Sequence, residues 1–139
     1  MKLTEKQKQD IIEEFNSWKE KQYAGKTLEE RRELDAFFTP PELTIEMIES
    51  FDSIENKSII DPTAGAGGLI AACILAGANP ELCYCNEYDA DFVALCKERL
   101  IPLGVPEENI HQGDVFDFRS ISRDSFTKSY HIPKKKNLW

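Results

Sequence analysis

The sequence predicts an α/β fold, in which a parallel sheet with helices between its strands follows an N-terminal helical segment. Two observations indicate this. Residues 57–116 alternate short apolar runs with longer helical patterns in the order β-α-β-α-β, which implies parallel strands joined by right-handed crossovers. Residues 1–36 instead carry apolar side chains at helical spacing and two helix-capping sequences.

The helical segment is predicted to contain two helices. Thr4-Glu-Lys-Gln7 has the spacing of a capping box, in which two side chains satisfy free N–H groups at a helix start. Gly25 ends this first pattern, and a second capping box at Thr27-Leu-Glu-Glu30 opens a short helix to about Asp35. The apolar residues expected to share one face of the first helix are Ile11, Ile12, Phe15 and Trp18.

A third helix is predicted to begin at Thr39-Pro-Pro-Glu42. The Thr39 hydroxyl is expected to accept a hydrogen bond from a free N–H of the first turn, and Pro40 occupies a position that needs no donor. The expected buried stripe of this helix consists of Leu43, Met47, Ile48 and Phe51.

The sheet region follows from Lys57. Its predicted elements are a strand at 58–61, a glycine-rich turn at 62–68, a helix at 69–77, a strand at 82–87, a helix from Asp89 to about Leu103 and a strand at 110–115.

The glycine-rich turn indicates a nucleotide-type ligand. Glycines between a first strand and its helix let a ligand approach the backbone, and the helix N–H groups face it. Glu87 lies 20 residues after Gly67, at the end of the second strand, where a carboxylate can accept both ribose hydroxyls. Asp114 ends the third strand, where an adenine amino group can donate to it. Together these residues describe an adenosine-shaped site across three strand ends.

Four motifs resemble S-adenosylmethionine (SAM)-dependent methyltransferases, in the version used by adenine-specific DNA methyltransferases. Asp61-Pro-Thr-Ala-Gly-Ala-Gly-Gly68 resembles their first motif, and Phe37-Phe-Thr-Pro-Pro-Glu-Leu43 resembles the one placed just before it. Asn86-Glu-Tyr-Asp89 and His111-Gln-Gly-Asp-Val-Phe116 resemble the motifs of the second and third strands. The resemblance implies a Rossmann-like parallel sheet, a truncated SAM-methyltransferase fold, with SAM as cofactor.

The resemblance also implies individual roles. The methionine end of SAM would contact Phe38, Thr39 and Pro40, and the methionine and ribose would be framed by Asp61, Thr63, Gly65 and Gly67. The ribose hydroxyls would bind Glu87 and the adenine would meet Tyr88, Asp114 and Phe116.

Each role has a purely structural alternative. Thr39 would serve only as a helix cap, and the two glycines only as a tight turn. Glu87 would be a solvated carboxylate, Asp114 an acid in a turn, and Tyr88 a side chain packed in the core. A fold fragment without any ligand is the corresponding alternative for the whole chain.

The fourth motif of these enzymes has no match here. They hold the target amino group with Asn/Asp/Ser-Pro-Pro followed by an aromatic, but the only Pro-Pro pair is Pro40-Pro41. The family implies this motif and a fourth strand after Asp117, where the chain ends instead. We therefore name no catalytic residue, and leave open whether the protein is an enzyme. The outer edge of the strand at 58–61 is expected to be open, and to be covered by the tail around residues 120–132 or by a second chain, as in a dimer.

Composition and charge restrict the partners. The 139 residues carry a net charge of −8, with 41% hydrophobic and 30% charged residues, which suffices for one domain with a core. The predicted divisions are a helical segment at 1–36 with net charge −1, a SAM-binding domain at 37–118 with −12, and a basic tail at 119–139 with +5. The −12 body repels phosphate, so direct DNA binding is not expected of it. The charged N-terminus lacks an apolar signal core, so a cytoplasmic protein without membrane contact is expected.

The cysteines and histidines indicate no disulfide and no metal site. Buried free thiols are expected at Cys73, Cys83, Cys85 and Cys96, because all four lie in apolar stretches without a CxxC pair. His111 and His131 lack the spacing of metal ligands.

Three functions follow. The first is a module that binds SAM or S-adenosylhomocysteine without catalysis and serves in sequestration, sensing or interaction. The second is the cofactor-binding part of an adenine methyltransferase completed by a second chain. A stand-alone enzyme acting on SAM or a small acceptor ranks last, because Asp61, Glu87 and Asp114 are all assigned to binding.

Overall fold

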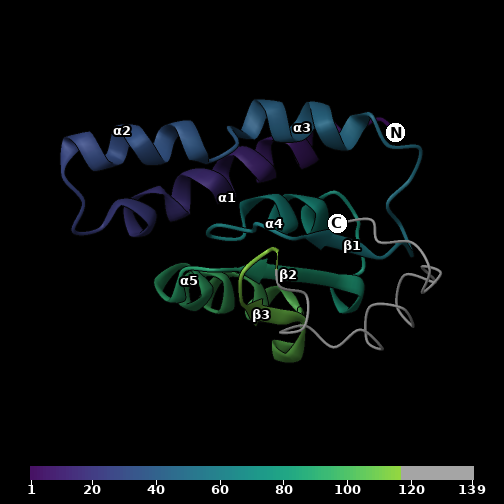
Figure 1. Ribbon diagram of the computed structural model, residues 1–139. Coiled ribbons are helices and arrows are strands. Elements are labelled where there is room, and N and C mark those ends of the chain that lie inside the picture. Colours follow the sequence, from purple (N-terminus) through teal and green to yellow (C-terminus); the bar gives the residue numbers. More distant parts are fainter. Residues whose placement is uncertain (117–139) are drawn as a thin grey trace.

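The computed structural model describes residues 1–116, without the side chains of residues 36 and 37 (Figure 1). Its helices are α1 (Glu5–Tyr23), α2 (Leu28–Phe37), α3 (Pro41–Glu49), α4 (Gly68–Leu75) and α5 (Ala90–Leu100). Its strands are β1 (Ile59–Asp61), β2 (Cys83–Glu87) and β3 (Ile110–Gln112), and short 3-10 helices form η1 (Pro80–Leu82), η2 (Ile101–Leu103) and η3 (Glu107–Asn109).

The sheet confirms the predicted Rossmann-like α/β fold. Its strand order is β1-β2-β3, and both pairings are parallel. Ile59 lies opposite Cys83, and Cys85 lies opposite Ile110. Every residue of β2 is buried, as expected for a strand with a neighbour on each side. The third strand is shorter than predicted and ends at Gln112, not Val115.

The helices stack on the sheet in successive layers. Both α4 and α5 pack against strands, and α1 packs on α4 and α3 (Figure 1). Residues from the N-terminal segment, such as Leu3 and Ile11, belong to the same buried cluster as Cys83 and Cys85 of β2. One core thus joins the N-terminal segment to the sheet, while the predicted boundaries at residues 36 and 118 stay predictions.

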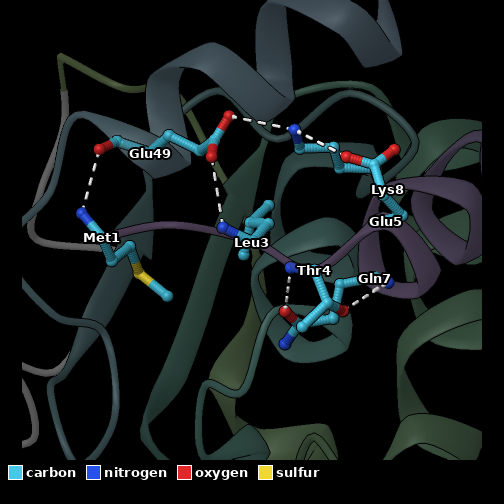
Figure 2. A network of polar contacts seen from close by, with 7 residues as sticks. All are labelled: Met1, Leu3, Thr4, Glu5, Gln7, Lys8 and Glu49. Carbon is cyan, nitrogen blue, oxygen red and sulfur yellow. Dashed lines mark hydrogen bonds and ion pairs between the residues drawn. The ribbon is translucent and has the colours of Figure 1, made fainter.

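Polar contacts tie the start of α1 to the end of α3 (Figure 2). The Leu3 N–H donates to Glu49 Oε2 at 3.1 Å, and the Met1 amino nitrogen donates to the Glu49 carbonyl at 3.0 Å. Lys8 lies 3.9 Å from the same carboxylate. In the predicted capping box, Thr4 N–H donates to Gln7 Oε1 at 2.9 Å and Gln7 N–H donates to Thr4 Oγ1 at 3.1 Å.

The start of α3 differs from the prediction. The second capping box, at Thr27 and Glu30, is present, but α3 begins only at Pro41 and has no side-chain cap. Thr39 therefore does not cap this helix. The reason is one of register, since Pro40 occupies the N-cap position in extended conformation and leaves Thr39 one residue too early. The Pro40 carbonyl instead accepts a hydrogen bond from the Thr44 hydroxyl at 3.1 Å.

The buried face of α3 also differs from the prediction. Only Ile48 of the expected stripe is buried, whereas Leu43, Met47 and Phe51 are 48%, 38% and 43% exposed. The buried positions form an i, i+3, i+4, i+7 set, Pro41, Thr44, Ile45 and Ile48. Thr44 fits this face because its hydroxyl is satisfied within the helix.

Further observations concern the cysteines, membrane spans, metal ligands and the tail. All four cysteines are buried free thiols. Among residues 1–116, no helix is long and apolar enough to cross a membrane, and no cluster of side chains suits a metal ion. The basic tail, His131 and the predicted cover of the β1 edge fall on residues 117–139, outside the described part of the chain.

Candidate functional site

The glycine-rich turn connects the end of β1 to the start of α4. Gly65 and Gly67 both adopt positive φ, at 56° and 84°, and Gly67 is the left-handed N-cap of α4. The positive φ favours glycine at position 67, and a Cβ there would lie 3.1 Å from Leu100 Cδ1, so the Leu100 side chain would have to shift. The loop closes on itself through a 2.9 Å hydrogen bond from the Gly67 N–H to the Ala64 carbonyl.

Glu87 holds this loop against the sheet. Its Oε1 accepts a hydrogen bond from the Gly65 N–H at 2.9 Å, and its Oε2 accepts one from the Asp89 N–H at 2.7 Å. The residue is only 8% exposed. The alternative of a solvated carboxylate is therefore wrong, and Glu87 fixes both the loop and the turn into α5.

Asp61 brings a second carboxylate to the neighbouring strand end. Its Oδ1 accepts a hydrogen bond from the Thr63 N–H at 3.1 Å, which shapes the first turn of the loop. Burial raises the pKa of Asp61, and the nearby charge of Glu87 raises it further, against the opposing effect of the Thr63 N–H. Two acids thus lie at adjacent strand ends, beside a loop of backbone N–H groups.

Phe38 reaches the same loop from the segment between α2 and α3. Its Cε1 lies 3.1 Å from where a Cβ on Gly65 would stand, so this glycine makes room for the ring. The ring also packs edge-to-face against Phe92 at a centroid distance of 5.7 Å, and against Tyr23 at 6.4 Å. The motif at residues 37–43 and the motif at residues 61–68 therefore lie in contact through Phe38 and Gly65. Thr39 is exposed, as is Pro40.

The other predicted residues lie at the surface beyond the strand ends. Tyr88 is 74% exposed and Phe116 is 92% exposed, so core packing of Tyr88 is wrong. Asp114 is exposed, and its Oδ1 accepts a hydrogen bond from the Phe116 N–H at 2.9 Å, which makes it a turn acid in this structure. These three residues follow the carboxyl ends of β2 and β3 and form no hydrogen bond or ion pair with the described residues of the glycine loop.

Asn86 is a residue whose individual role the sequence reasoning missed. Its Nδ2 donates to the Pro62 carbonyl at 3.2 Å and to the Gly113 carbonyl at 3.0 Å, so one side chain joins the loops that follow β1 and β3. It is 1% exposed, and its Oδ1 has no hydrogen-bond partner. The available signal was a strong hydrogen-bonding side chain inside an otherwise apolar strand.

Two side chains of α5 donate hydrogen bonds to backbone carbonyls of the glycine loop. The Cys96 thiol donates to the Gly65 carbonyl at 3.0 Å, and Arg99 Nη1 donates to the Ala66 carbonyl at 3.3 Å. The sequence predicted Cys96 as a buried thiol but not its contact with the loop, and it gave no role to Arg99, although an arginine in the apolar repeat of a helix signals a buried partner.

A separate cavity of about 380 Å³ lies at the opposite end of the sheet. Met1, Gln7, Gly77 and residues 52–55 contribute to its lining. These residues precede β1 or follow α4, so the cavity does not belong to the glycine-loop site.

The sheet is Rossmann-like, and a glycine-rich loop and the carboxylates of Asp61 and Glu87 lie at the ends of its adjacent strands. The sequence matches the family described as N-6 DNA Methylase over residues 23–131, well over half of its length. The chain therefore belongs to the N-6 DNA methylase family. No curated protein and no solved structure matches it.

Proposed function

We propose that this protein binds S-adenosylmethionine at the carboxyl edge of its sheet. The observation that carries the proposal is the hydrogen bond from the Gly65 N–H to the Glu87 carboxylate. This bond joins the glycine loop, which follows β1, to the end of β2. Membership in a methylase family supports the choice of cofactor, because methylases of this family use this methyl donor.

The residues present fit such a ligand. Each oxygen of Glu87 accepts one backbone N–H and keeps a second lone pair for a ribose hydroxyl. The Asp61 carboxylate suits the ammonium group of the methionine, while Asp114 suits the adenine amino group. The aromatic rings of Tyr88 and Phe116 offer faces for the adenine. The remaining proposed contacts come from Phe38, Thr39, Pro40, Thr63, Gly65 and Gly67.

These residues account for binding and not for transfer. The bound cofactor would supply an activated methyl group on its sulfonium. The printed sequence contains no Asn/Asp/Ser-Pro-Pro-aromatic stretch to hold an acceptor amine. We therefore propose a cofactor-binding role for these residues, in sequestration, sensing or interaction, with S-adenosylhomocysteine as a second ligand.

Titration calorimetry tests this proposal. We expect wild-type protein to bind SAM and S-adenosylhomocysteine with micromolar Kd. Asp61→Asn, which keeps an acceptor for the Thr63 N–H, should weaken SAM binding by about tenfold through the lost charge. Glu108→Gln is the matched control, because Glu108 is an exposed acid outside the site. Absence of binding at millimolar ligand would refute the proposal.

A second candidate is the cofactor-binding part of an adenine DNA methyltransferase that is completed by another chain. The family match favours it, because it extends through the whole sheet region. The −12 charge of residues 37–118 makes a separate DNA-binding surface necessary. Adding a chain that carries the Asn-Pro-Pro-aromatic motif should then produce adenine methylation of DNA, and we expect no methylation from this protein alone. If the mixture stays inactive while SAM binds, the binding role stands and this candidate fails.

A further inference from the structure

A buried ion pair joins α1 to α5 beside the glycine loop. Arg99 Nε donates to Glu14 Oε2 at 2.8 Å, and Arg99 Nη2 pairs with Glu14 Oε1 in a second, parallel contact. The guanidinium also lies 5.6 Å from the centre of the Trp18 ring. Glu14 and Trp18 belong to α1, whereas Arg99 belongs to α5, so the pair crosses two helices far apart in sequence.

Burial makes this pair sensitive to the loss of either partner. The Arg99 side chain is 1% exposed and the Glu14 side chain 16% exposed. An arginine at such a position needs its carboxylate, because an unpaired buried charge is strongly unfavourable. The planar guanidinium has a third edge, and this edge faces the glycine loop.

The third contact of Arg99 reaches the loop backbone. Its Nη1 donates to the carbonyl of Ala66, the residue between the two glycines with positive φ. A Cβ on Gly68 would lie 3.5 Å from the same nitrogen, so the guanidinium lies directly beside the first turn of α4. Glu87 accepts a hydrogen bond from the neighbouring Gly65 N–H. The loop backbone is thus held both by a carboxylate of β2 and by a guanidinium that is paired with Glu14 of α1.

We infer that Glu14 and Arg99 are positioning residues for the cofactor loop, so that α1 controls cofactor affinity without touching the cofactor. The inference rests on the proposed SAM site. It extends beyond the family relationship, because Glu14 lies outside the matched residues 23–131. Displacement of α1 would remove the Glu14 carboxylate, free Arg99, and loosen the loop that faces the ligand.

Two variants and a matched control test the inference on the full chain. Glu14→Gln removes the charge at nearly constant volume, and Arg99→Lys keeps the charge but loses the fork that reaches two partners at once. Glu98→Gln is the control, since it breaks the Lys21–Glu98 pair between the same two helices at 2.6 Å. The side chains of that pair are half exposed and form no hydrogen bond with the described residues of the glycine loop.

The readouts are amide hydrogen exchange at Gly65 and Gly67, and the Kd for S-adenosylhomocysteine. The Gly65 N–H donates to Glu87 Oε1 and the Gly67 N–H donates to the Ala64 carbonyl, so the exchange of both amides reports the opening of the loop. In Glu14→Gln and Arg99→Lys we expect about tenfold faster exchange at these amides, unchanged exchange along β2, and about tenfold weaker binding. The control should stay within about twofold of wild type.

The outcomes separate this inference from the proposed function. Unchanged loop exchange in both variants would overturn the inference. If wild type does not bind S-adenosylhomocysteine, the proposed function fails, while faster loop exchange would still establish the positioning role of the pair. If exchange rises equally along β2, or if neither these variants nor the milder Glu14→Asp fold, the pair is only a requirement for folding and the inference is rejected.

Discussion

At the scale of single residues, Glu87 combines a structural role with the proposed role in binding the cofactor. Replacement by alanine would leave the buried Gly65 N–H without its acceptor and would free the Asp89 N–H. We expect Glu87→Ala to lower the free energy of unfolding by about 2 kcal/mol, as is usual for an unsatisfied buried donor. Glu87→Gln keeps one acceptor oxygen and should lose less. Urea denaturation measures both, and equal stability of Glu87→Ala and wild type would show that the loop does not depend on this carboxylate.

Asp61 should show the opposite effect on stability. Burial and the charge of Glu87 raise its pKa above the ordinary value of 3.8, so the native state binds the proton more tightly than the unfolded state. The free energy of unfolding of the wild type therefore increases as the pH falls from the raised native pKa of Asp61 to its pKa in the unfolded state. Asp61→Asn should be more stable than wild type at pH 7, with a difference that shrinks on acidification. Parallel denaturation curves measure this, and a less stable variant at pH 7 would contradict it.

At the scale of elements, the three threonines that precede helices differ in role. Thr4 and Thr27 accept hydrogen bonds from the N–H groups of Gln7 and Glu30, whereas Thr39 does not cap α3. We expect Thr4→Ala and Thr27→Ala each to cost about 1 kcal/mol of unfolding free energy. Thr39→Ala should cost less than about 0.5 kcal/mol. A Thr39→Ala variant as unstable as Thr4→Ala would restore the capping role that the structure denies.

Helix α3 gives a second test, of its buried face. Ile48 is fully buried, while Met47 beside it is 38% exposed. We expect Ile48→Ala to cost about 2–5 kcal/mol and Met47→Ala about 1 kcal/mol or less. Thermal unfolding of the two variants measures the difference. Equal losses would mean that the sequence-based stripe, not the observed one, faces the core.

Local sequence signals predicted some elements of this fold and not others. Glycine positions, helix caps and short apolar runs are local signals, and they sufficed to predict the parallel sheet, both capping boxes and the start of α5 at Asp89. They did not suffice for α3, where two overlapping periodicities compete and only the packing of α1 and α4 selects one. The hydrogen bonds from the Asn86 and Arg99 side chains to loop carbonyls could likewise not be predicted, because their acceptors lie more than 20 residues away in the sequence.

At the scale of the whole molecule, ligand binding should stabilise one shared core. The glycine loop contacts β2, α5 and the Phe38 segment, and α1 joins the same buried cluster. A ligand that binds only the native state at 100 times its Kd adds about 2.7 kcal/mol of stability. We expect a single unfolding transition that moves up by several degrees with S-adenosylhomocysteine. Two separate transitions, or no shift, would contradict a single core coupled to the site.

An NMR titration with S-adenosylhomocysteine tests the proposed cofactor site at the carboxyl edge of this sheet. Backbone amide shifts should change first at Gly65, Gly67, Tyr88 and Asp114, and the residues around the 380 Å³ cavity at the opposite end of the sheet should not respond. Saturation at micromolar ligand with this pattern is the predicted result. Shifts confined to other residues, or no shifts at millimolar ligand, would contradict a cofactor site at this edge of the sheet.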